Sequence, residues 1–365
     1  MNLSSPTSLL PELPSEAQVL IVRLRSIGDV VLTTPALAAL HEWRPDLRLS
    51  VLVEPACAPV LEGNPAVSEV ILSGEFLSTV RQLRKRRFSM AFNQHAGPRS
   101  AILTRFSGAP VRVCWANRQF SALYNVLVPE PVPMEGESAQ MHTVEHRLRQ
   151  FYWAGLPAGP IPPAFVYPRP TAIASVEQQL AERGIEPGMP YAVLRPGGRY
   201  FTMRWSVEHF GAIARWLREA HGIATVVDMS RGDREVIAAV RYHLGRVSAV
   251  FQSFDLRELI ALIAGARLFV GNDSGPTHIA AALGRPSVVV FGSSSSVHWR
   301  PWRTEHRVAQ NYFPCNPCRG DRCYEFDQPR CILSVTVDQV REACEALLAG
   351  RETAGSAGAT VQIEN

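Results

Sequence analysis

The sequence lacks any long apolar run. None of its hydrophobic stretches approaches the roughly 18–20 residues that a helix needs to cross a bilayer, so we predict no transmembrane segment. The first residues also lack Lys and Arg and contain only a short apolar patch at Leu9 and Leu10, which makes them a poor signal peptide. We expect residues 1–17 to be a flexible leader.

A strong charge of either sign is missing as well. The chain has 37 Lys and Arg against 33 Asp and Glu, a formal net charge of +4, and this mild balance does not indicate a nucleic-acid partner. Hydrophobic residues make up 46% of the chain, as in ordinary globular proteins. A length of 365 residues is sufficient for two domains, each with a core of its own.

The cysteine pattern does not indicate a disulfide framework. The chain has seven cysteines, an odd number, and four of them lie in one short segment near the C-terminus. Such a pattern favours a reducing compartment, which we take to be the cytoplasm. We expect Cys57, Cys114 and Cys344 to be ordinary core residues.

Short apolar strands alternate with helical patterns along most of the chain, which is typical of a doubly wound parallel sheet. The rhythm stops in the Pro-rich segment 158–170 and then restarts. We therefore predict the α/β class, with two Rossmann-like domains facing across a cleft. The expected divisions are a leader 1–17, a first domain 18–157, a linker 158–172, a second domain 173–349 that carries a Cys-rich loop 314–331, and a disordered tail 350–365.

One stretch, residues 268–292, combines a buried strand, a polar turn and a short helix. Backbone amides at the start of a helix, together with the helix dipole, favour an anion, and ligands of open α/β sheets bind at the carboxyl ends of strands. Gly275 permits close approach, and His278 lies one turn inside the helix, where it can donate to a phosphate. Asp273 would repel a bare phosphate, so we expect it to face sugar hydroxyls or to orient the loop. A helix cap with a half-buried histidine is the alternative.

Two further turns follow predicted strands. Ser26-Ile27-Gly28-Asp29 lacks the glycines of a dinucleotide fingerprint, and Asp29 could simply complement a helix N-terminus. In the segment 195–205, glycines would let backbone amides reach a diphosphate, which a guanidinium could also hold. The alternative there is that Trp205 is core and Arg204 is surface.

These motifs resemble glycosyltransferase family 9, the bacterial heptosyltransferases of lipopolysaccharide core synthesis. Asp273-Ser274-Gly275, His278 and the string AALGRP at 281–286 resemble its C-terminal signature, and Arg25-Ser26-Ile27-Gly28-Asp29 resembles its N-terminal motif. The resemblance covers roughly residues 19–348. It implies the GT-B fold, with the acceptor on the first domain and the nucleotide sugar on the second.

The resemblance also implies the reaction. It is the transfer of a heptose from ADP-heptose, with inversion and without a catalytic metal, to a hydroxyl of a lipid-linked saccharide. The acceptor implies peripheral attachment to the cytoplasmic face of the inner membrane. Another nucleotide sugar, a protein acceptor, or a non-catalytic nucleotide-sugar-binding module remain alternatives.

Residue roles follow from the same resemblance, with Asp29 as the catalytic base. Met203 and Ser206 replace a lysine and a proline of many relatives, which leaves open whether Arg199 or Arg204 grips the diphosphate; we prefer Arg204. Donor-binding candidates are Gly197, Gly198, Arg199, Arg204, Glu235, Phe254, Asp273, Ser274, Gly275 and His278. Acceptor-binding candidates, each of which could be a plain surface residue, are Arg25, His95, Arg99, Arg118, His142 and Arg147.

The clustered cysteines are Cys315, Cys318, Cys323 and Cys331. Four thiolates at this spacing can close a tetrahedral site for structural zinc or iron, although the spacing is not a common zinc-finger one. Free buried thiols or disulfides are the alternatives. Many family 9 chains carry a similar loop and others lack it, so we do not expect it to perform the chemistry.

Overall fold

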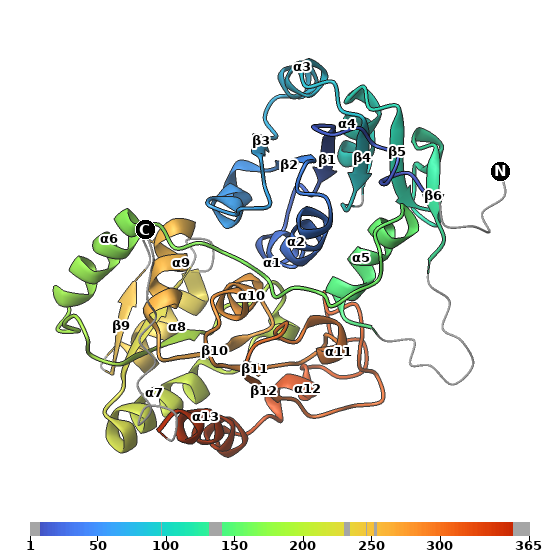
Figure 1. Ribbon diagram of the computed structural model, residues 1–365. Helices are drawn as coiled ribbons and strands as arrows, with labels where there is room; N and C mark the ends of the chain where they lie inside the picture. Colours follow the sequence, from blue (N-terminus) through green and yellow to red (C-terminus); the bar gives the residue numbers. More distant parts are fainter. Residues whose placement is uncertain are drawn as a thin grey trace. The chain divides into compact units, whose positions relative to one another are not determined.

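The computed structural model describes residues 8–95, 97–130, 141–229, 234–245, 247–251 and 254–352. The chain divides into two compact units. The first unit comprises residues 1–169 and 297–303, and the second comprises 170–296 and 304–365. Each unit is built on one six-stranded parallel sheet, which confirms the predicted α/β class with two Rossmann-like domains (Figure 1).

The sheet of the first unit has its earliest strand near the middle. Its order is β3(Glu69–Leu72), β2(Arg48–Val53), β1(Gln18–Val22), β4(Met90–Asn93), β5(Val111–Trp115), β6(Val126–Val128). Its longer helices are α2(Thr34–Trp43), α3(Phe76–Lys85), α4(Pro98–Phe106) and α5(Thr143–Trp153). Helix α2 packs against α5, and α3 packs against α4. The chain order reverses between β1 and β4, so the segments after these two strands lie at the topological switch point where such sheets bind ligands.

The helical segment that follows β1 is divided into two helices. The short α1(Ile27–Val31) follows β1, and α2 begins after Thr33, with Pro35 in its first turn. Proline is tolerated there because the first amides of a helix have no intrahelical acceptor. The break lies at Leu32 and Thr33, so Asp29 belongs to the short first helix.

The second unit repeats the plan. Its sheet order is β12(His306–Ala309), β11(Ser287–Val290), β10(Leu268–Asn272), β7(Tyr191–Arg195), β8(Ala224–Asp228), β9(Ser248–Phe251). Its longer helices are α6(Pro170–Ala181), α7(Val207–His221), α8(Arg234–Leu244), α9(Leu256–Gly265), α10(Gly275–Ala282) and α13(Val337–Glu352). Helices α7, α8 and α13 form one group of neighbours, and α6, α9 and α10 form another. The switch point of this sheet lies between β7 and β10.

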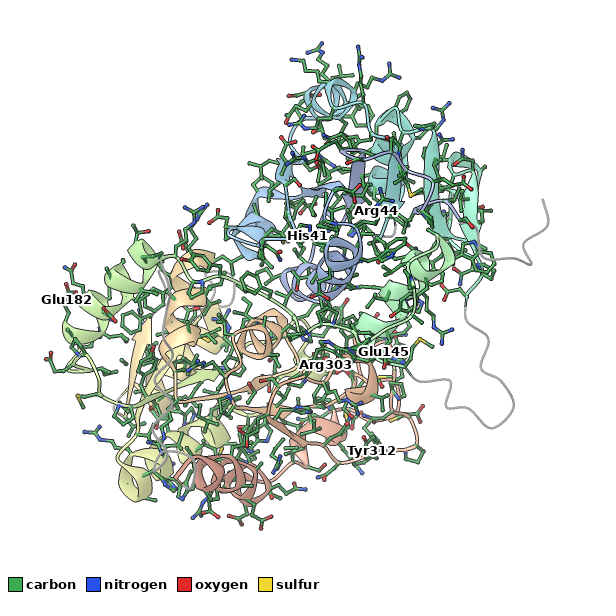
Figure 2. All side chains as sticks on the ribbon, viewed as in Figure 1. His41, Arg44, Glu145, Glu182, Arg303 and Tyr312 are labelled. Carbon is green, nitrogen blue, oxygen red and sulfur yellow. The ribbon has the colours of Figure 1, made fainter. Side chains whose placement is uncertain are left out.

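Residues 8–17 differ from the predicted flexible leader. Leu10 is fully buried, and its amide donates to the Ala154 carbonyl over 2.8 Å. Arg44, labelled in Figure 2, donates to the carbonyls of Leu10 and Leu13 over 2.9 and 3.0 Å. The physical reason is the Leu9–Leu10 patch, whose apolar surface is removed from water against the first unit.

The division between the units differs in detail from the predicted boundaries. Residues of the Pro-rich segment are bonded within the first unit, since Pro162 accepts from the Trp302 indole over 3.0 Å and the Phe165 amide donates to Thr34 over 2.9 Å. Residues 297–303 belong to the same unit. Helix α13 continues to Glu352, past the expected end at 349, and the rest of the tail lies outside the described residues. In the part of the chain that the structure describes, no helix has the length and apolar character needed to cross a bilayer.

Candidate functional site

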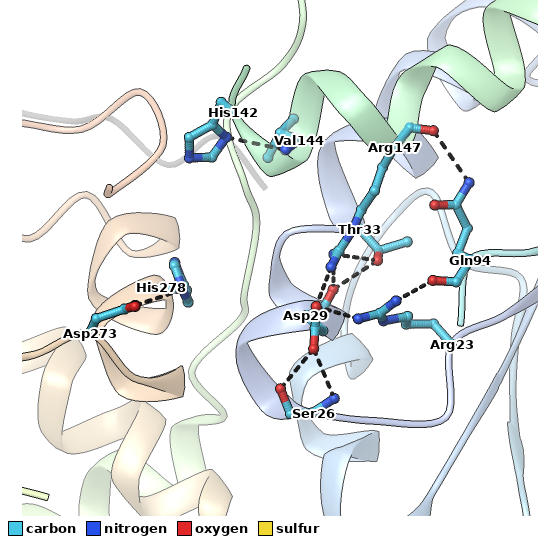
Figure 3. A network of polar contacts seen from close by, with 10 residues as sticks. All are labelled: Arg23, Ser26, Asp29, Thr33, Gln94, His142, Val144, Arg147, Asp273 and His278. Carbon is cyan, nitrogen blue, oxygen red and sulfur yellow. Dashed lines mark hydrogen bonds and ion pairs between the residues drawn. The ribbon is translucent and has the colours of Figure 1, made fainter. Parts of the chain in front are cut away.

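Asp29 lies in the first turn of α1, directly beyond the carboxyl end of β1. The Ser26 hydroxyl donates to Asp29 Oδ2 over 2.9 Å, and the Ser26 amide points at the same oxygen over 3.4 Å (Figure 3). This reciprocal capping box explains locally why the sequence turns from strand into helix here. It also presents Oδ2 on the side of an exposed serine.

Two arginines from distant parts of the first unit meet the other carboxylate oxygen. Arg147 from α5 and Arg23 from the end of β1 both form ion pairs with Asp29 Oδ1. Arg147 also donates to the Thr33 hydroxyl over 3.0 Å, and Arg23 donates to the Gln94 carbonyl after β4 (Figure 3). The network therefore ties together the two strand ends at the switch point, α2 and α5.

The charges around Asp29 decide its protonation state. Its side chain is 22% exposed, while those of Arg147 and Arg23 are 5% and 11% exposed. Burial by itself raises the pKa of Asp29, but the guanidinium groups of Arg147 and Arg23, helped by Ser26, outweigh it and hold the pKa well below its usual range. Asp29 is therefore an ionised carboxylate at neutral pH, able to accept a proton or orient a donor at Oδ2.

The predicted acceptor-binding arginines differ in burial and in their contacts. Arg147 is buried against Asp29, so the structure joins two residues that were predicted separately. Arg25 and Arg118 are exposed, and Arg118 lies 3.7 Å from Glu130. Arg99 is also exposed and donates to the Ser73 hydroxyl over 3.2 Å. Of the predicted acceptor residues, these three exposed arginines are the ones that present a guanidinium to solvent.

The two histidines among the predicted acceptor residues are neutral rings in the structure. Burial, and then the nearby Arg23, lower the pKa of His95 to about 4, so its ring is neutral at pH 7. His142 is 2% exposed, caps α5 through the Val144 amide over 3.2 Å, and contacts the Arg300 carbonyl over 2.9 Å. Burial lowers its pKa to about 4 as well. His142 is therefore a neutral cap of α5, because its ring nitrogens are used by backbone groups.

In the second unit, Asp273 follows β10 and His278 lies within α10. Both are buried, with 6% and 3% exposure, and His278 Nε2 lies 4.0 Å from Asp273 Oδ1 (Figure 3). Burial raises the pKa of Asp273 to about 6. Unlike Asp29, this carboxyl has no arginine within ion-pair distance among the described residues.

The N-terminus of α10 is not capped by its own side chain. Ser274 holds the N-cap position, yet its hydroxyl accepts no helix amide, and within the described segments this buried oxygen has no hydrogen-bond partner. Gly275 and Pro276 follow, so the first turn presents backbone rather than bulky side chains. Amides at such a helix start are suited to an anion.

The segment between β7 and α7, residues 196–205, forms a loop at the same edge of the sheet. Arg204 Nε donates to the Gly198 carbonyl over 2.9 Å, closing the loop on itself. A Cβ on Gly198 would lie 2.8 Å from the Met203 carbonyl oxygen, so glycine is required there. Gly197 and Arg204 are half-buried, while Arg199 is exposed and its guanidinium lies 5.0 Å from the Tyr200 ring centre. Trp205 is core, with 1% exposure, but Arg204 is half-buried, so the alternative interpretation agrees with the structure for Trp205 and not for Arg204.

Asn272 is a residue that sequence reasoning missed. It is fully buried at the end of β10, and its amide donates to the Pro196 carbonyl over 2.8 Å while accepting from the Trp205 amide over 3.1 Å. It therefore holds both ends of loop 196–205. The available signal was a polar residue that ends an otherwise apolar strand.

A second missed feature is the buried pair of Arg195 and Asp228, at the carboxyl ends of β7 and β8. Arg195 Nη1 forms an ion pair with Asp228 Oδ2, and burial raises the pKa of Asp228. Phe254 stacks on Phe251 with ring centres 4.6 Å apart. Glu235 lies in the first turn of α8, and its side chain is outside the described residues.

The four clustered cysteines line one cavity of about 360 Å³ in the second unit, together with Thr202, Ser293 and Arg330. Burial, and then the neighbouring thiols of Cys315, Cys318 and Cys323, raise the pKa of Cys331. All seven cysteines are free thiols, with Cys57, Cys114 and Cys344 buried as predicted. Among the described residues, no three His, Cys, Asp or Glu side chains are already arranged as a metal site.

Comparison with known proteins places these features in one family. The model of glycosyltransferase family 9 (heptosyltransferase) matches residues 76–327. Lipopolysaccharide heptosyltransferase 3 of Escherichia coli is 29% identical over 76% of this chain and 84% of its own length. Lipopolysaccharide heptosyltransferase 1 of Pseudomonas aeruginosa is 26% identical over 92% and 99%.

Solved structures agree on the fold. A family 9 glycosyltransferase from Veillonella parvula superposes with a TM-score of 0.81 at 19% identity, covering 93% of this chain and 99% of that one. The E. coli ADP-heptose lps heptosyltransferase II gives 0.75 at 23% identity, covering 92% and 99%. The iron-containing dodecameric glycosyltransferase TibC of enterotoxigenic E. coli gives 0.56 at 14% identity, covering 95% and 81%.

Proposed function

Because the chain belongs to glycosyltransferase family 9 and is a glycosyltransferase, we propose that it transfers a heptose from ADP-heptose to a hydroxyl of a lipopolysaccharide core saccharide. The names of the curated relatives support heptose and lipopolysaccharide, and the ADP-heptose lps heptosyltransferase II among the solved neighbours supports ADP-heptose as the donor. The observation that carries the proposal is the ionised Asp29, whose Oδ2 faces an exposed serine at a sheet switch point.

We propose that the donor binds the second unit. The uncapped start of α10 at Ser274 and Gly275 would receive the diphosphate, with His278 donating to it. Asp273 would accept from hydroxyls of the donor sugar, since a carboxylate would repel the phosphates. Burial supports the role of Asp273 as a partner of sugar hydroxyls. It raises the pKa of this carboxyl to about 6, and a hydroxyl that donates a hydrogen bond to the carboxylate stabilises its charged form.

Loop 196–205 supplies the remaining donor groups. Gly197 and Gly198 would bring backbone amides to the diphosphate, and we prefer Arg204 over Arg199 as its cation. The Arg204 guanidinium is held at the loop by the Gly198 carbonyl, whereas Arg199 is exposed and stacks on Tyr200. A fixed cation stabilises the charge that develops on the leaving nucleoside diphosphate. Phe254 and Glu235 remain candidates for the nucleoside.

We propose that the reaction is a single displacement with inversion. The acceptor hydroxyl attacks the anomeric carbon, its proton passes to Asp29 Oδ2, and ADP leaves with the electrons of the broken C–O bond. Protein cations and helix amides, rather than a catalytic metal, would stabilise ADP. Arg25, Arg99 and Arg118 are the exposed cations available to an anionic acceptor in the first unit.

The setting of the enzyme follows from its substrates. The proposed nucleotide-sugar donor would place the reaction in the cytoplasm. A lipid-linked acceptor would bring the enzyme to the cytoplasmic face of the inner membrane as a peripheral protein.

The four-cysteine segment fits a structural metal, which we propose to be zinc or iron. Cys315, Cys318, Cys323 and Cys331 line one cavity, so thiolate ligands could converge on a single ion there. The iron named for TibC supports iron as one candidate. The ion would close the loop without taking part in sugar transfer. Metal analysis of the purified protein tests this, with about one zinc or iron per chain expected and loss of the metal in Cys318→Ser.

Donor binding by calorimetry tests the proposed function. ADP-heptose and ADP should bind, UDP-glucose and GDP-mannose should not, and Asp273→Ala should lose the preference for ADP-heptose over ADP. Tighter binding of UDP-glucose or GDP-mannose than of ADP-heptose would leave the assignment as a glycosyltransferase intact but would contradict heptose as the transferred sugar. Binding of ADP-heptose without transfer to any saccharide or protein acceptor would indicate a non-catalytic module.

A further inference from the structure

The cysteine loop, residues 315–331, is hydrogen-bonded to the loop that precedes α7. The Thr202 hydroxyl donates to the Gly320 carbonyl and lies 3.0 Å from the Ser293 hydroxyl. The Cys318 amide donates to the Ser293 carbonyl over 3.0 Å. Thr202 and Ser293 also line the cavity that holds the four thiols. Thr202 thus touches both the cysteine loop and the segment after β11.

The three segments are in close contact at Gly292 and Gly320, beside the cavity that holds the thiols. A Cβ on Gly292 would lie 2.4 Å from the Thr202 carbonyl oxygen. Gly320 has a φ of +76°, and a Cβ there would lie 2.7 Å from the Ser293 hydroxyl. Thr202 and Ser293 are 1% and 2% exposed. A shift of the cysteine loop must therefore be passed on to Thr202 or leave buried polar groups unpaired, which is costly.

Loop 196–205 is held at two places. Asn272 fixes its base through Pro196 and Trp205, as described above. Thr202 fixes its far side, in the short 3₁₀ turn that directly precedes Arg204. The strand end fixes the base, while the far side is held by the cysteine loop at Gly320 and by Ser293, whose amide donates to the Thr202 carbonyl over 3.4 Å.

We propose that Thr202 is a positioning residue through which the cysteine loop sets the conformation of loop 196–205. Closure of the four-thiol cluster by a metal ion then tightens the binding of a nucleoside diphosphate at Gly197, Gly198 and Arg204. The inference rests on the proposed function, because it takes the diphosphate of the donor as the ligand of loop 196–205. Its physical basis is preorganisation, since a loop already held in its binding conformation loses less entropy when the ligand arrives.

Calorimetric titration with ADP tests the coupling. The protein is compared as stripped with EDTA and as reloaded with Zn²⁺ or Fe²⁺. Couplings between two sites are typically on the order of 5- to 150-fold, and we expect metal loading to tighten ADP binding by roughly tenfold in the wild type. Thr202→Val, which removes the hydroxyl but keeps the shape, should reduce this effect to less than about twofold, and Thr202→Ser should restore it.

Thr225→Val is a matched control. Thr225 is also 1% exposed in the second unit, and its hydroxyl lies 2.6 Å from that of Ser248 in the neighbouring strand. The same substitution there should lower stability by a similar amount but leave the metal effect on ADP unchanged. A general loss of stability is thereby separated from a loss of coupling.

A second measurement needs no variant. Coupling is reciprocal, so saturation with ADP must raise the Zn²⁺ or Fe²⁺ affinity of the wild type by the same factor. Equal ADP affinity with and without metal, or full metal sensitivity in Thr202→Val, would overturn the inference and leave the proposed function standing. A wild type that binds neither ADP nor ADP-heptose in any metal state would overturn the proposed function, and the inference with it.

Discussion

Asp29 and Asp273 are the two carboxylates that follow central strands of the two sheets, and their surroundings have opposite effects. Asp29 shares one oxygen with two guanidinium groups, which hold its pKa well below the usual range. Asp273 is more deeply buried, with the His278 ring at 4.0 Å, and burial raises its pKa to about 6. The carboxyl of the first unit thus stays ionised far below neutral pH, whereas the carboxyl of the second unit gains a proton near pH 6.

The difference teaches how each carboxylate is suited to its partner. Asp29 is always ionised at physiological pH, as a group that receives a proton must be, although its paired arginines make it a weak base until the acceptor hydroxyl becomes acidic during attack. Asp273 carries an electrostatic cost in the unliganded protein that hydroxyl donors of a sugar would relieve. Burying the charge of Asp273 therefore costs free energy at the proposed donor site. The charge of Asp29 is already balanced by Arg23 and Arg147.

The largest expected effect is on turnover. Asp29→Asn should lower kcat by roughly 10²- to 10⁴-fold, because general base catalysis typically contributes that much, while ADP affinity stays unchanged. Steady-state transfer with ADP-heptose, together with calorimetry, measures both. Near-normal turnover in a folded variant would show that Asp29 is not the base.

The ion pairs of Asp29 with Arg23 and Arg147 also predict which variant loses more unfolding free energy. Asp29→Asn leaves two buried arginines without a counter-ion and should cost about 3–5 kcal/mol of unfolding free energy. Arg147→Gln leaves the Arg23–Asp29 pair intact and should cost less, about 1–3 kcal/mol. Denaturant unfolding of both variants checks the order. If Arg147→Gln were the more damaging, packing of the Arg147 side chain rather than charge would dominate.

The pH dependence should separate the two carboxylates. For Asp273, the folded pKa of about 6 lies above the unfolded value, so its contribution is fully present below about pH 4 and is lost as pH rises through 6. Asp273→Asn should therefore match the wild type near pH 4 and exceed its stability by up to about 2 kcal/mol at pH 8.

Asp29 should behave in the opposite way. Its folded pKa is depressed, so its contribution to stability is present above about pH 4 and is lost as pH falls further. Thermal melts of the wild type, Asp29→Asn and Asp273→Asn across pH 3–8 test both signs. If the melting temperatures of the two variants changed with pH in the same way, the two carboxylates would not have the opposite effects described here.

The smallest effect should come from Ser26→Ala. Removing the hydroxyl deletes one hydrogen bond to Asp29 Oδ2 but leaves both arginines in place. We expect a rate loss of less than about tenfold, since one hydrogen bond to a charged group is worth about 1.5–3 kcal/mol at most and is partly replaced by water here. A loss as large as that of Asp29→Asn would assign Ser26 a direct role in proton transfer.

The sequence by itself determined the alternating strands and helices, the two-domain α/β class and the motifs around Asp29 and Asp273. These are local properties, because apolar runs and turn glycines such as Gly275 are recognised within a few residues of one another. The break before α2 at Pro35 belongs to the same kind of local signal.

The tertiary structure alone decided which side chains meet. Nothing in the sequence places Arg147 on Asp29, because 118 residues separate them and only the packing of α5 on α2 brings them together. The same holds for His142, whose charge depends on burial beside Arg300, for Asn272 at both ends of loop 196–205, and for Thr202 against Gly320. Charge state and positioning depend on contacts between distant segments, since burial and neighbouring charges set a pKa.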